Sequence, residues 1–251
     1  MSIPPQRTLA SSASLEGTSL HTGKKVTLTM SPAPANSGIL FRRIDLDDQP
    51  FIPAVVDNVQ QVERSTTIAV GSVKVHTVEH VISALTGMGV DNAIIEMNAN
   101  EPPIGDGSAA PYVECIKTAG ITEQDQLCSV FEVRDPIHIE VGDGSLITIV
   151  PDKAFRISCT QVGPEGKMTQ YFSTEITPET YEREIAPART FVFYEDVEPL
   201  LEKGLIKGGS LENAVVVRDN SVLSKEPFRF EDEFARHKVL DVIGDLMLAG
   251  K

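Results

Sequence analysis

Residues 228–250 constrain the fold of this chain more than any other stretch, because their pattern predicts one long amphipathic helix. Within it, His237, Asp241 and Asp245 recur at every fourth position. A step of four residues turns a helix by only about 40°, so the three side chains should form one slowly drifting stripe. The neighbouring face is apolar and should pack into a core; it carries Leu240, Ile243 and Met247. A histidine and a carboxylate one turn apart can bind one metal ion, although on this helix alone a surface stripe with one stabilising contact is the simpler interpretation.

A second helix far upstream strengthens the metal interpretation. Residues 76–85 carry apolar side chains at helical spacing, and glycines follow them, as is usual at the end of a helix. A catalytic zinc site uses three protein ligands and leaves a fourth position for water. His80, His237 and Asp241 would supply that set. Glu79, about 100° around the helix from His80, could act as the general base toward the water.

The same residues allow two other interpretations. Residues 76–80 fit H-x-x-E-H, the inverted zinc-protease motif, in which His76 and His80 both bind zinc and Glu79 is the base. A match at only three fixed positions is weak evidence for this motif. The other interpretation is that Glu79 and His80 are a polar pair on a helix surface. The two metal interpretations differ in whether His76 or the helix at 228–250 completes the site.

The rest of the pattern predicts an α+β fold with two related domains, 1–125 and 126–251. The first should contain strands at 25–30, 38–43, 66–70, 73–75 and 91–97 and a helix from 108 to about 118. The second should contain strands at 133–139, 144–150, 155–160 and 214–217 and a helix near 194–203. Polar residues gather at 119–127, where we place the boundary. Each domain is expected to be a small sheet packed with helices, with the metal site between the two domains.

Composition excludes several classes of protein. No apolar run approaches the roughly 18 residues that a membrane helix needs, so we expect no stable membrane insertion. The net charge of −14 argues against nucleic acid as a partner. The cysteines are odd in number and widely spaced, which predicts reduced, mostly buried thiols in a cytoplasmic protein; they are Cys115, Cys128 and Cys159.

Several short motifs follow one another in the order found in one enzyme family. They are S-L-H-T-G-K at 19–24, T-V-E-H at 77–80, D-G-S-A-A-P at 106–111, A-R-T-F at 188–191 and R-H-K-x-L-D-x-I-G-D at 236–245. Together they resemble the UDP-3-O-acyl-N-acetylglucosamine deacetylases of lipid A synthesis. The resemblance covers essentially the whole chain, and the last motif is specific enough that chance is a poor explanation.

The resemblance implies a cytoplasmic, metal-dependent amidase whose two α+β domains enclose the site. It implies that zinc, or alternatively iron(II), is bound by His80, His237 and Asp241, and that Glu79 is the general base. His76 lies outside the family's motif, which counts against the protease interpretation. The expected substrate is UDP-3-O-(3-hydroxyacyl)-N-acetylglucosamine, whose N-acetyl group is hydrolysed with release of acetate by a protein expected to be a monomer.

The resemblance also assigns residues that contact the substrate. Thr190 would contact the tetrahedral intermediate or the attacking water, and Phe191 would line the pocket. Lys238 would offer its charge to the nucleotide portion of the UDP-sugar, which an otherwise acidic protein needs. The family's hydrophobic passage for the acyl chain corresponds here to Leu211, Ala214 and Val216. A buried strand is an equally good interpretation of those three side chains.

One departure from the family lies at the end of the sequence. The family has a further strand–helix unit, whose histidine pairs with the aspartate matched here by Asp245. This sequence ends at Lys251 without a histidine after His237. We therefore expect a fragment, for example of a fusion with a dehydratase domain, in which Asp245 faces water or a basic side chain. The alternative is a catalytically weak or inactive relative that binds metal and nucleotide sugar; an inverted-motif zinc peptidase is the third possibility.

Overall fold

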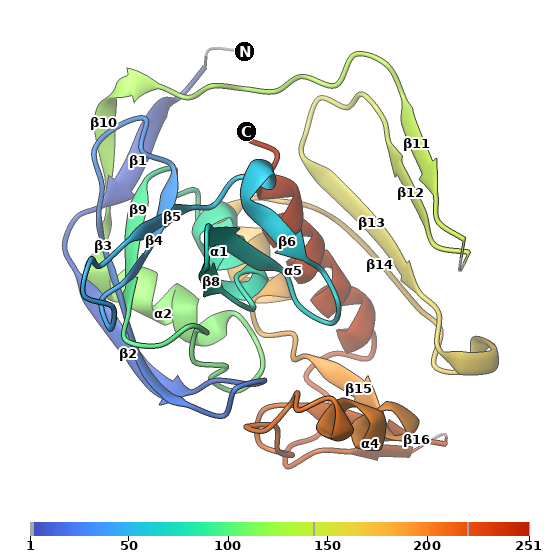
Figure 1. Ribbon diagram of the computed structural model, residues 1–251. Helices are drawn as coiled ribbons and strands as arrows, with labels where there is room; N and C mark the ends of the chain where they lie inside the picture. The colour runs from blue at the N-terminus through green and yellow to red at the C-terminus, as the bar shows by residue number, and fades with distance from the viewer. Residues whose placement is uncertain (1–2, 143, 220, 251) are drawn as a thin grey trace.

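The computed structural model describes residues 3–142, 144–219 and 221–250, and it confirms the α+β class (Figure 1). Its largest sheet has the strand order β2-β3-β9-β4-β5. Only the β4–β9 pair in this sheet is parallel. The five strands are β2 (Ala13–Thr18), β3 (Lys25–Pro32), β4 (Ile39–Arg43), β5 (Phe51–Pro53) and β9 (Ala93–Met97).

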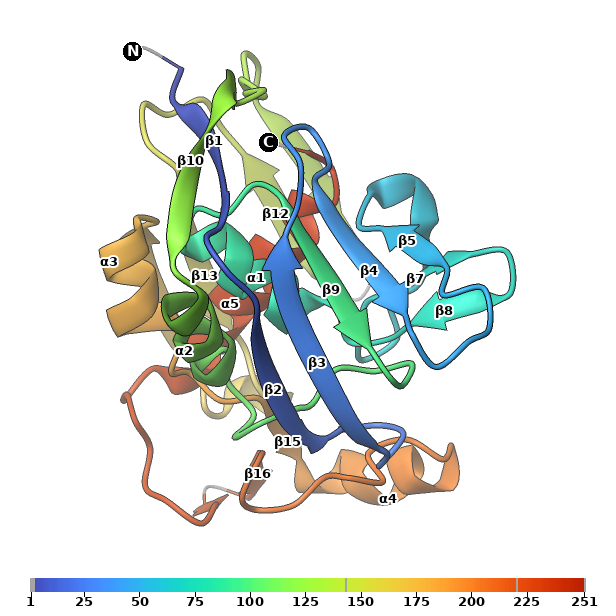
Figure 2. The ribbon, with the colours of Figure 1, turned by 90° about the vertical axis from the view of Figure 1, so that its left-hand side faces the viewer.

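The alternation of β3 explains how this sheet meets the core. Val26, Leu28 and Met30 are buried, while the residues between them are partly exposed. A strand points successive side chains to opposite faces, so every second residue faces inward. Two helices, α1 (Glu79–Gly87) and α2 (Ala110–Ala119), pack with the sheet in one core cluster. Figure 2 shows the sheet in front of α1 and α5.

The polar segment at which we place the domain boundary is a strand. β10 (Ile121–Leu127) pairs antiparallel with β1 (Pro5–Leu9), so the expected boundary after residue 125 falls inside a strand. Most of its side chains are exposed while its backbone is paired, which accounts for the polar composition. Gln124 fixes it further by donating to the carbonyl of Ala33 over 2.9 Å. The division into two domains stays a prediction.

The remaining elements are short. The first half also holds β6 (Val59–Gln61), β7 (Thr67–Val70), β8 (Val73–Val75) and a 3₁₀ turn at Val56–Asn58. The later strands are β11 (Ile137–Glu140), β12 (Leu146–Ile149), β13 (Arg156–Gln161), β14 (Gln170–Glu175), β15 (Phe191–Phe193), β16 (Val215–Arg218) and β17 (Ser221–Leu223). The later helices are α3 (Pro178–Thr180), α4 (Tyr194–Glu202) and α5 (Glu233–Met247), with a 3₁₀ turn at Pro164–Gly166 and a π-helical turn at Tyr181–Ile185. The strand expected from residue 133 begins only at Ile137.

The cysteines of this chain are free thiols. No disulfide joins Cys115, Cys128 and Cys159, but only Cys115 is buried and the other two are half-buried. The expectation that the thiols are mostly buried is therefore wrong for two of the three.

Among the described residues, no helix is long and apolar enough to span a membrane.

Helix α5 runs beside α1 at the centre of the molecule. Figure 1 shows the pair between the five-stranded sheet and the β13–β14 hairpin, and α5 contacts both α1 and that hairpin. Leu240 and Ile243 are buried as expected, and Met247 is half-buried against the same core. Helix α1 is buried along nearly its whole length. The two helices that carry the candidate ligands are therefore packed directly against each other.

Gly244 makes this close packing possible. A Cβ atom at this position would lie 2.2 Å from the carbonyl oxygen of Glu79 and 2.9 Å from its Cα. Because both are backbone atoms, no side-chain rotation could relieve the overlap. Glycine inside a helix costs roughly 1 kcal/mol relative to alanine, so its presence here is explained by the approach of the two backbones.

Replacing Gly244 with alanine should therefore destabilise the protein, against the usual helix preference. We expect the free energy of unfolding to fall by about 1–3 kcal/mol, the usual cost of overpacking a core. Urea denaturation measures it, with Gly142→Ala as the control, because a Cβ there meets nothing within 4 Å. A Gly244→Ala protein as stable as the wild type would show that the two helices do not approach this closely.

Candidate metal centre

Helices α1 and α5 bring His80, His237 and Asp241 together. Each offers one ligand atom, and these atoms lie within 4.8 Å of one another. Among the described residues, no other set of three or more histidine, cysteine or acidic side chains is arranged in this way. The Oδ1 atom of Asp241 lies 3.6 Å from Nε2 of His80 and 3.5 Å from Nε2 of His237. Tetrahedral bonds of about 2.0–2.2 Å place two ligand atoms about 3.3–3.6 Å apart, so these spacings fit a zinc ion.

Burial and charge give two of the three groups the protonation state that a metal ligand needs. Burial lowers the pKa of His237 to about 4, so its ring is neutral. Burial alone would raise the pKa of Asp241, but the positive charge of Lys238 holds it well below its usual range. Burial opposes protonation of His80, yet the nearby negative charge of Asp241 raises its pKa. A cation can bind only the neutral ring of His80, so it competes with a proton there.

The ring of His237 is oriented by a backbone carbonyl. Its Nδ1 donates to the oxygen of Ala188 over 3.0 Å, which leaves Nε2 facing Asp241. Histidines that bind metals usually donate their other ring nitrogen in this way, which fixes both tautomer and orientation. The Nδ1 of His80 is buried without a hydrogen-bond partner among the described residues. The α5 ligand is therefore the more firmly oriented of the two histidines.

A buried ion pair holds this carbonyl in place. Glu233, one turn before His237 on α5, is fully buried. Its Oε1 accepts from the backbone N–H of Arg189 over 3.0 Å and from Nε over 2.8 Å, and its Oε2 accepts from Nη2 over 3.1 Å. Such bidentate, charge-assisted bonds fix geometry as well as adding energy. One carboxylate thus ties the segment from Ala188 to Thr190 to the helix that carries two candidate ligands.

Glu79 lies beside the three ligands as a buried carboxylate. Its Oε2 accepts a hydrogen bond from the backbone N–H of Thr66 over 3.0 Å. Burial raises its pKa to about 8, and the nearby negative charge of Asp241 adds to the shift. A cation held by the ligands would lower this pKa by charge attraction. Glu79 is thus placed to exchange a proton near neutral pH.

Asp245 has a partner that the sequence did not predict. Its Oδ1 accepts from the hydroxyl of Thr66 over 2.7 Å. Asp245 is exposed, so it does face water as expected, but its hydrogen-bond partner is a threonine and not a basic side chain. The reason is the loop before β7, which places Thr66 against the last turns of α5.

Lys238 lies on α5, and Phe191 begins β15, directly after Thr190. Lys238 donates to Oδ2 of Asp241 over 2.9 Å, and its ammonium group lies 5.5 Å from the centre of the Phe191 ring. That ring stacks on Phe234 at 4.3 Å and lies 6.4 Å from the His237 ring. Thr190 is half-buried, and its backbone N–H donates to the carbonyl of Gly107 over 2.7 Å.

The three residues suggested for the acyl passage are not a buried strand. In β16 the buried side chains are Val215 and Val217, whereas Val216 alternates with them and is half-buried. Ala214 is also half-buried, and Leu211 is 47% exposed. The buried-strand interpretation of Leu211, Ala214 and Val216 is therefore wrong. Their role in holding an acyl chain stays a prediction.

His76 does not belong to the ligand cluster. Its Nδ1 lies 2.9 Å from the hydroxyl oxygen of Thr67, on the neighbouring strand β7. The group of three that the structure assembles draws its remaining ligands from α5 instead.

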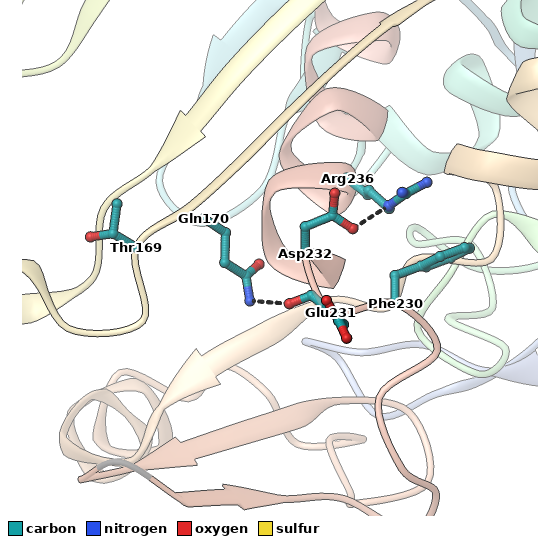
Figure 3. A pocket seen from close by; sticks show the side chains of 6 residues that line it. All are labelled: Thr169, Gln170, Phe230, Glu231, Asp232 and Arg236. Atoms are coloured by element: carbon teal, nitrogen blue, oxygen red, sulfur yellow. Dashed lines mark hydrogen bonds and ion pairs between the residues drawn. The ribbon is translucent and has the colours of Figure 1, made fainter.

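A surface hollow of about 470 Å³ lies near the N-terminal end of α5, as Figure 3 shows. It is lined by Thr169, Gln170, Phe230, Glu231, Asp232 and Arg236. Gln170 caps the helix by accepting from the backbone N–H of Phe234 over 2.8 Å. Arg236 pairs with Asp232 and lies over the Phe230 ring at 4.3 Å. None of the candidate ligands lines this hollow.

Sequence reasoning missed three residues that shape the site. Thr66 carried no signal, because a threonine beside a strand is ordinary and its partners are distant in the chain. Glu233 looked like an acidic residue in the first turn of a helix, where such residues are common. Gly244 did carry a signal, because an isolated glycine inside a helical pattern usually has a packing reason.

The amino-acid sequence also matches known proteins. The model of the UDP-3-O-acyl N-acetylglycosamine deacetylase family matches residues 6–251. The chain is 47% identical to the UDP-3-O-acyl-N-acetylglucosamine deacetylase of Anaeromyxobacter sp. (strain Fw109-5), over 98% of this chain and 80% of that protein. The proteins of the same name from Myxococcus xanthus and Saccharophagus degradans are 45% and 44% identical, each over 98% of this chain and over 78% and 82% of their own lengths. The chain therefore belongs to the UDP-3-O-acyl N-acetylglycosamine deacetylase family.

Proposed function

We propose that this chain hydrolyses the N-acetyl group of UDP-3-O-(3-hydroxyacyl)-N-acetylglucosamine in lipid A synthesis, with zinc, or alternatively iron(II), as its metal. The observation that carries the proposal is the group of His80, His237 and Asp241 beside the buried carboxylate of Glu79. Relatives with 44–47% identity are named as deacetylases of UDP-3-O-acyl-N-acetylglucosamine, which supplies the substrate. The site itself supports attack of water on an amide.

The reaction divides between the metal and the side chains of the chain. A zinc ion bound here would polarise the amide carbonyl and lower the pKa of water toward 7. Glu79 would accept the proton of the attacking water as its oxygen adds to the acetyl carbon. The bond from that carbon to nitrogen then breaks, acetate leaves, and the proton passes to the amine. Thr190 would donate a hydrogen bond to the oxygen that becomes negative during attack.

Recognition of the substrate would rest on charge and apolar surface next to the ligands. The Lys238 side chain is 43% exposed even though it pairs with Asp241, so its ammonium group can also meet a phosphate. Phe191 lies beside it and offers an aromatic face to the sugar. Leu211, Ala214 and Val216 would contact the acyl chain. We place this reaction in the cytoplasm and expect the chain to act as a monomer.

The first prediction concerns the ligand set. The chain should bind one divalent ion, and His80→Ala, His237→Ala and Asp241→Ala should each lose most of it, because two ligands cannot complete a zinc site. Metal content after dialysis measures this for each purified variant. His76→Ala is the matched control and should keep its metal. Loss of metal in His76→Ala with retention in Asp241→Ala would favour the H-x-x-E-H arrangement instead.

The second prediction separates the base from the ligands. Glu79→Gln keeps the shape of the side chain and removes its ability to accept a proton. It should retain the metal while kcat falls by about 10²–10⁴-fold, the usual contribution of general base catalysis. Acetate release and metal content are measured on the same preparation. A variant that keeps its metal and its full rate would show that Glu79 is not the base.

A further inference from the structure

Thr66 holds two carboxylates of the site at once. It is 5% exposed and lies just before β7, in the loop that faces both ligand helices. Its backbone N–H donates to Oε2 of Glu79 over 3.0 Å, and its hydroxyl donates to Oδ1 of Asp245 over 2.7 Å. Its carbonyl accepts from the backbone N–H of Val78 over 3.2 Å. All the polar atoms of this one residue are therefore committed to the start of α1 and the end of α5.

The start of α1 depends on this arrangement. The residue at the helix N-cap, Val78, has no side chain that could bond the first N–H groups. Thr77, just before it, has a φ of 55°, which is rare for a β-branched residue and needs support from its surroundings. The carbonyl of Thr66 provides part of that support by pairing with the Val78 N–H. The backbone of Thr66 thus sets the first turn of α1 and orients its carboxylate at the same time.

The hydroxyl of Thr66 has a separate task. Glu79 and Asp245 are both acidic, and each lies close enough to Asp241 for the negative charge of Asp241 to raise its pKa. A carboxyl side chain without fixed donors can adopt several rotamers. Donors placed between them hold each carboxylate in one orientation. Thr66 places its N–H on one and its hydroxyl on the other.

We propose that Thr66 is a positioning residue for the deacetylation: it aligns Glu79 through its N–H and Asp245 through its hydroxyl. This inference rests on the proposed function. It predicts that the hydroxyl matters for turnover even though it touches none of the three ligands. Groups that orient catalytic or ligating side chains typically change activity by about 10–100-fold when they are removed.

The adjacent threonine provides a matched control. Thr67 is 2% exposed, and its hydroxyl bonds Nδ1 of His76 over 2.9 Å. Changing Thr67 to valine therefore removes a buried hydroxyl next to Thr66 but leaves the hydrogen bonds of Glu79 and Asp245 in place. Valine has the shape of threonine, so both substitutions leave the backbone and its bonds in place.

The test compares Thr66→Val, Thr66→Ser and Thr67→Val in the metal-loaded protein. We expect kcat to fall by about 10–100-fold in Thr66→Val, with KM and metal content near those of the wild type. Serine keeps the hydroxyl and should restore most of that loss. Thr67→Val should keep the wild-type kcat. An unchanged kcat in Thr66→Val, or an equal loss in Thr67→Val, would overturn the proposal.

A second measurement applies if any variant folds poorly or the wild type shows no turnover. The free energy of unfolding of the metal-free protein is measured for Thr66→Val, Asp245→Asn and the double variant. Because the hydroxyl bonds that carboxylate directly, the two effects should not add, whereas strict additivity would contradict the contact. A wild-type protein that binds no metal or does not deacetylate the substrate would refute the proposed function. The comparison of the two single variants with the double variant would still decide whether Thr66 positions Asp245.

Discussion

The contact between the backbones of α1 and α5 at Gly244 is the constraint on which the rest of the site depends. The candidate ligands come from positions about 160 residues apart in the sequence, so only the packing of the two helices sets their separation. Gly244 lies against the carbonyl of Glu79, one residue before the ligand of α1, and follows the α5 ligand Asp241 by three residues. Because α1 is buried along nearly its whole length, it cannot shift to accommodate a larger neighbour. The spacing of the nitrogen and oxygen donors is thus a consequence of core packing.

Two carboxylates with opposite environments follow from this packing. Burial raises the pKa of Glu79 to about 8, and the nearby negative charge of Asp241 adds to the shift. Asp241 is also buried, but the positive charge of Lys238 holds its pKa well below the usual range. Environments that push the pKa values of neighbouring acids apart commonly separate a proton acceptor from a group that stays ionised. The polar groups around them, including the Glu233–Arg189 pair and the Thr66 donors, hold these two acids in fixed orientations.

The sequence was sufficient for the features that repeat locally. The four-residue spacing in α5 and the adjacent Glu79 and His80 on a second helix were readable because helical periodicity places side chains predictably. It was insufficient where partners are distant or where burial decides. The polar strand β10 looked like a linker, because pairing with β1 is a backbone property that composition does not record. Thr66 and Asp245, which share a hydrogen bond, are 179 positions apart in the sequence, and no local pattern encodes such a contact.

The most direct test of the central claim is an anomalous difference map at the zinc edge, from crystals of the zinc-loaded protein. The account predicts one strong peak between α1 and α5, within bonding distance of Nε2 of His80, Nε2 of His237 and a carboxylate oxygen of Asp241, with Glu79 beside it but outside the ligand set. A peak bound by His76 and His80, or no peak between the two helices, would contradict it.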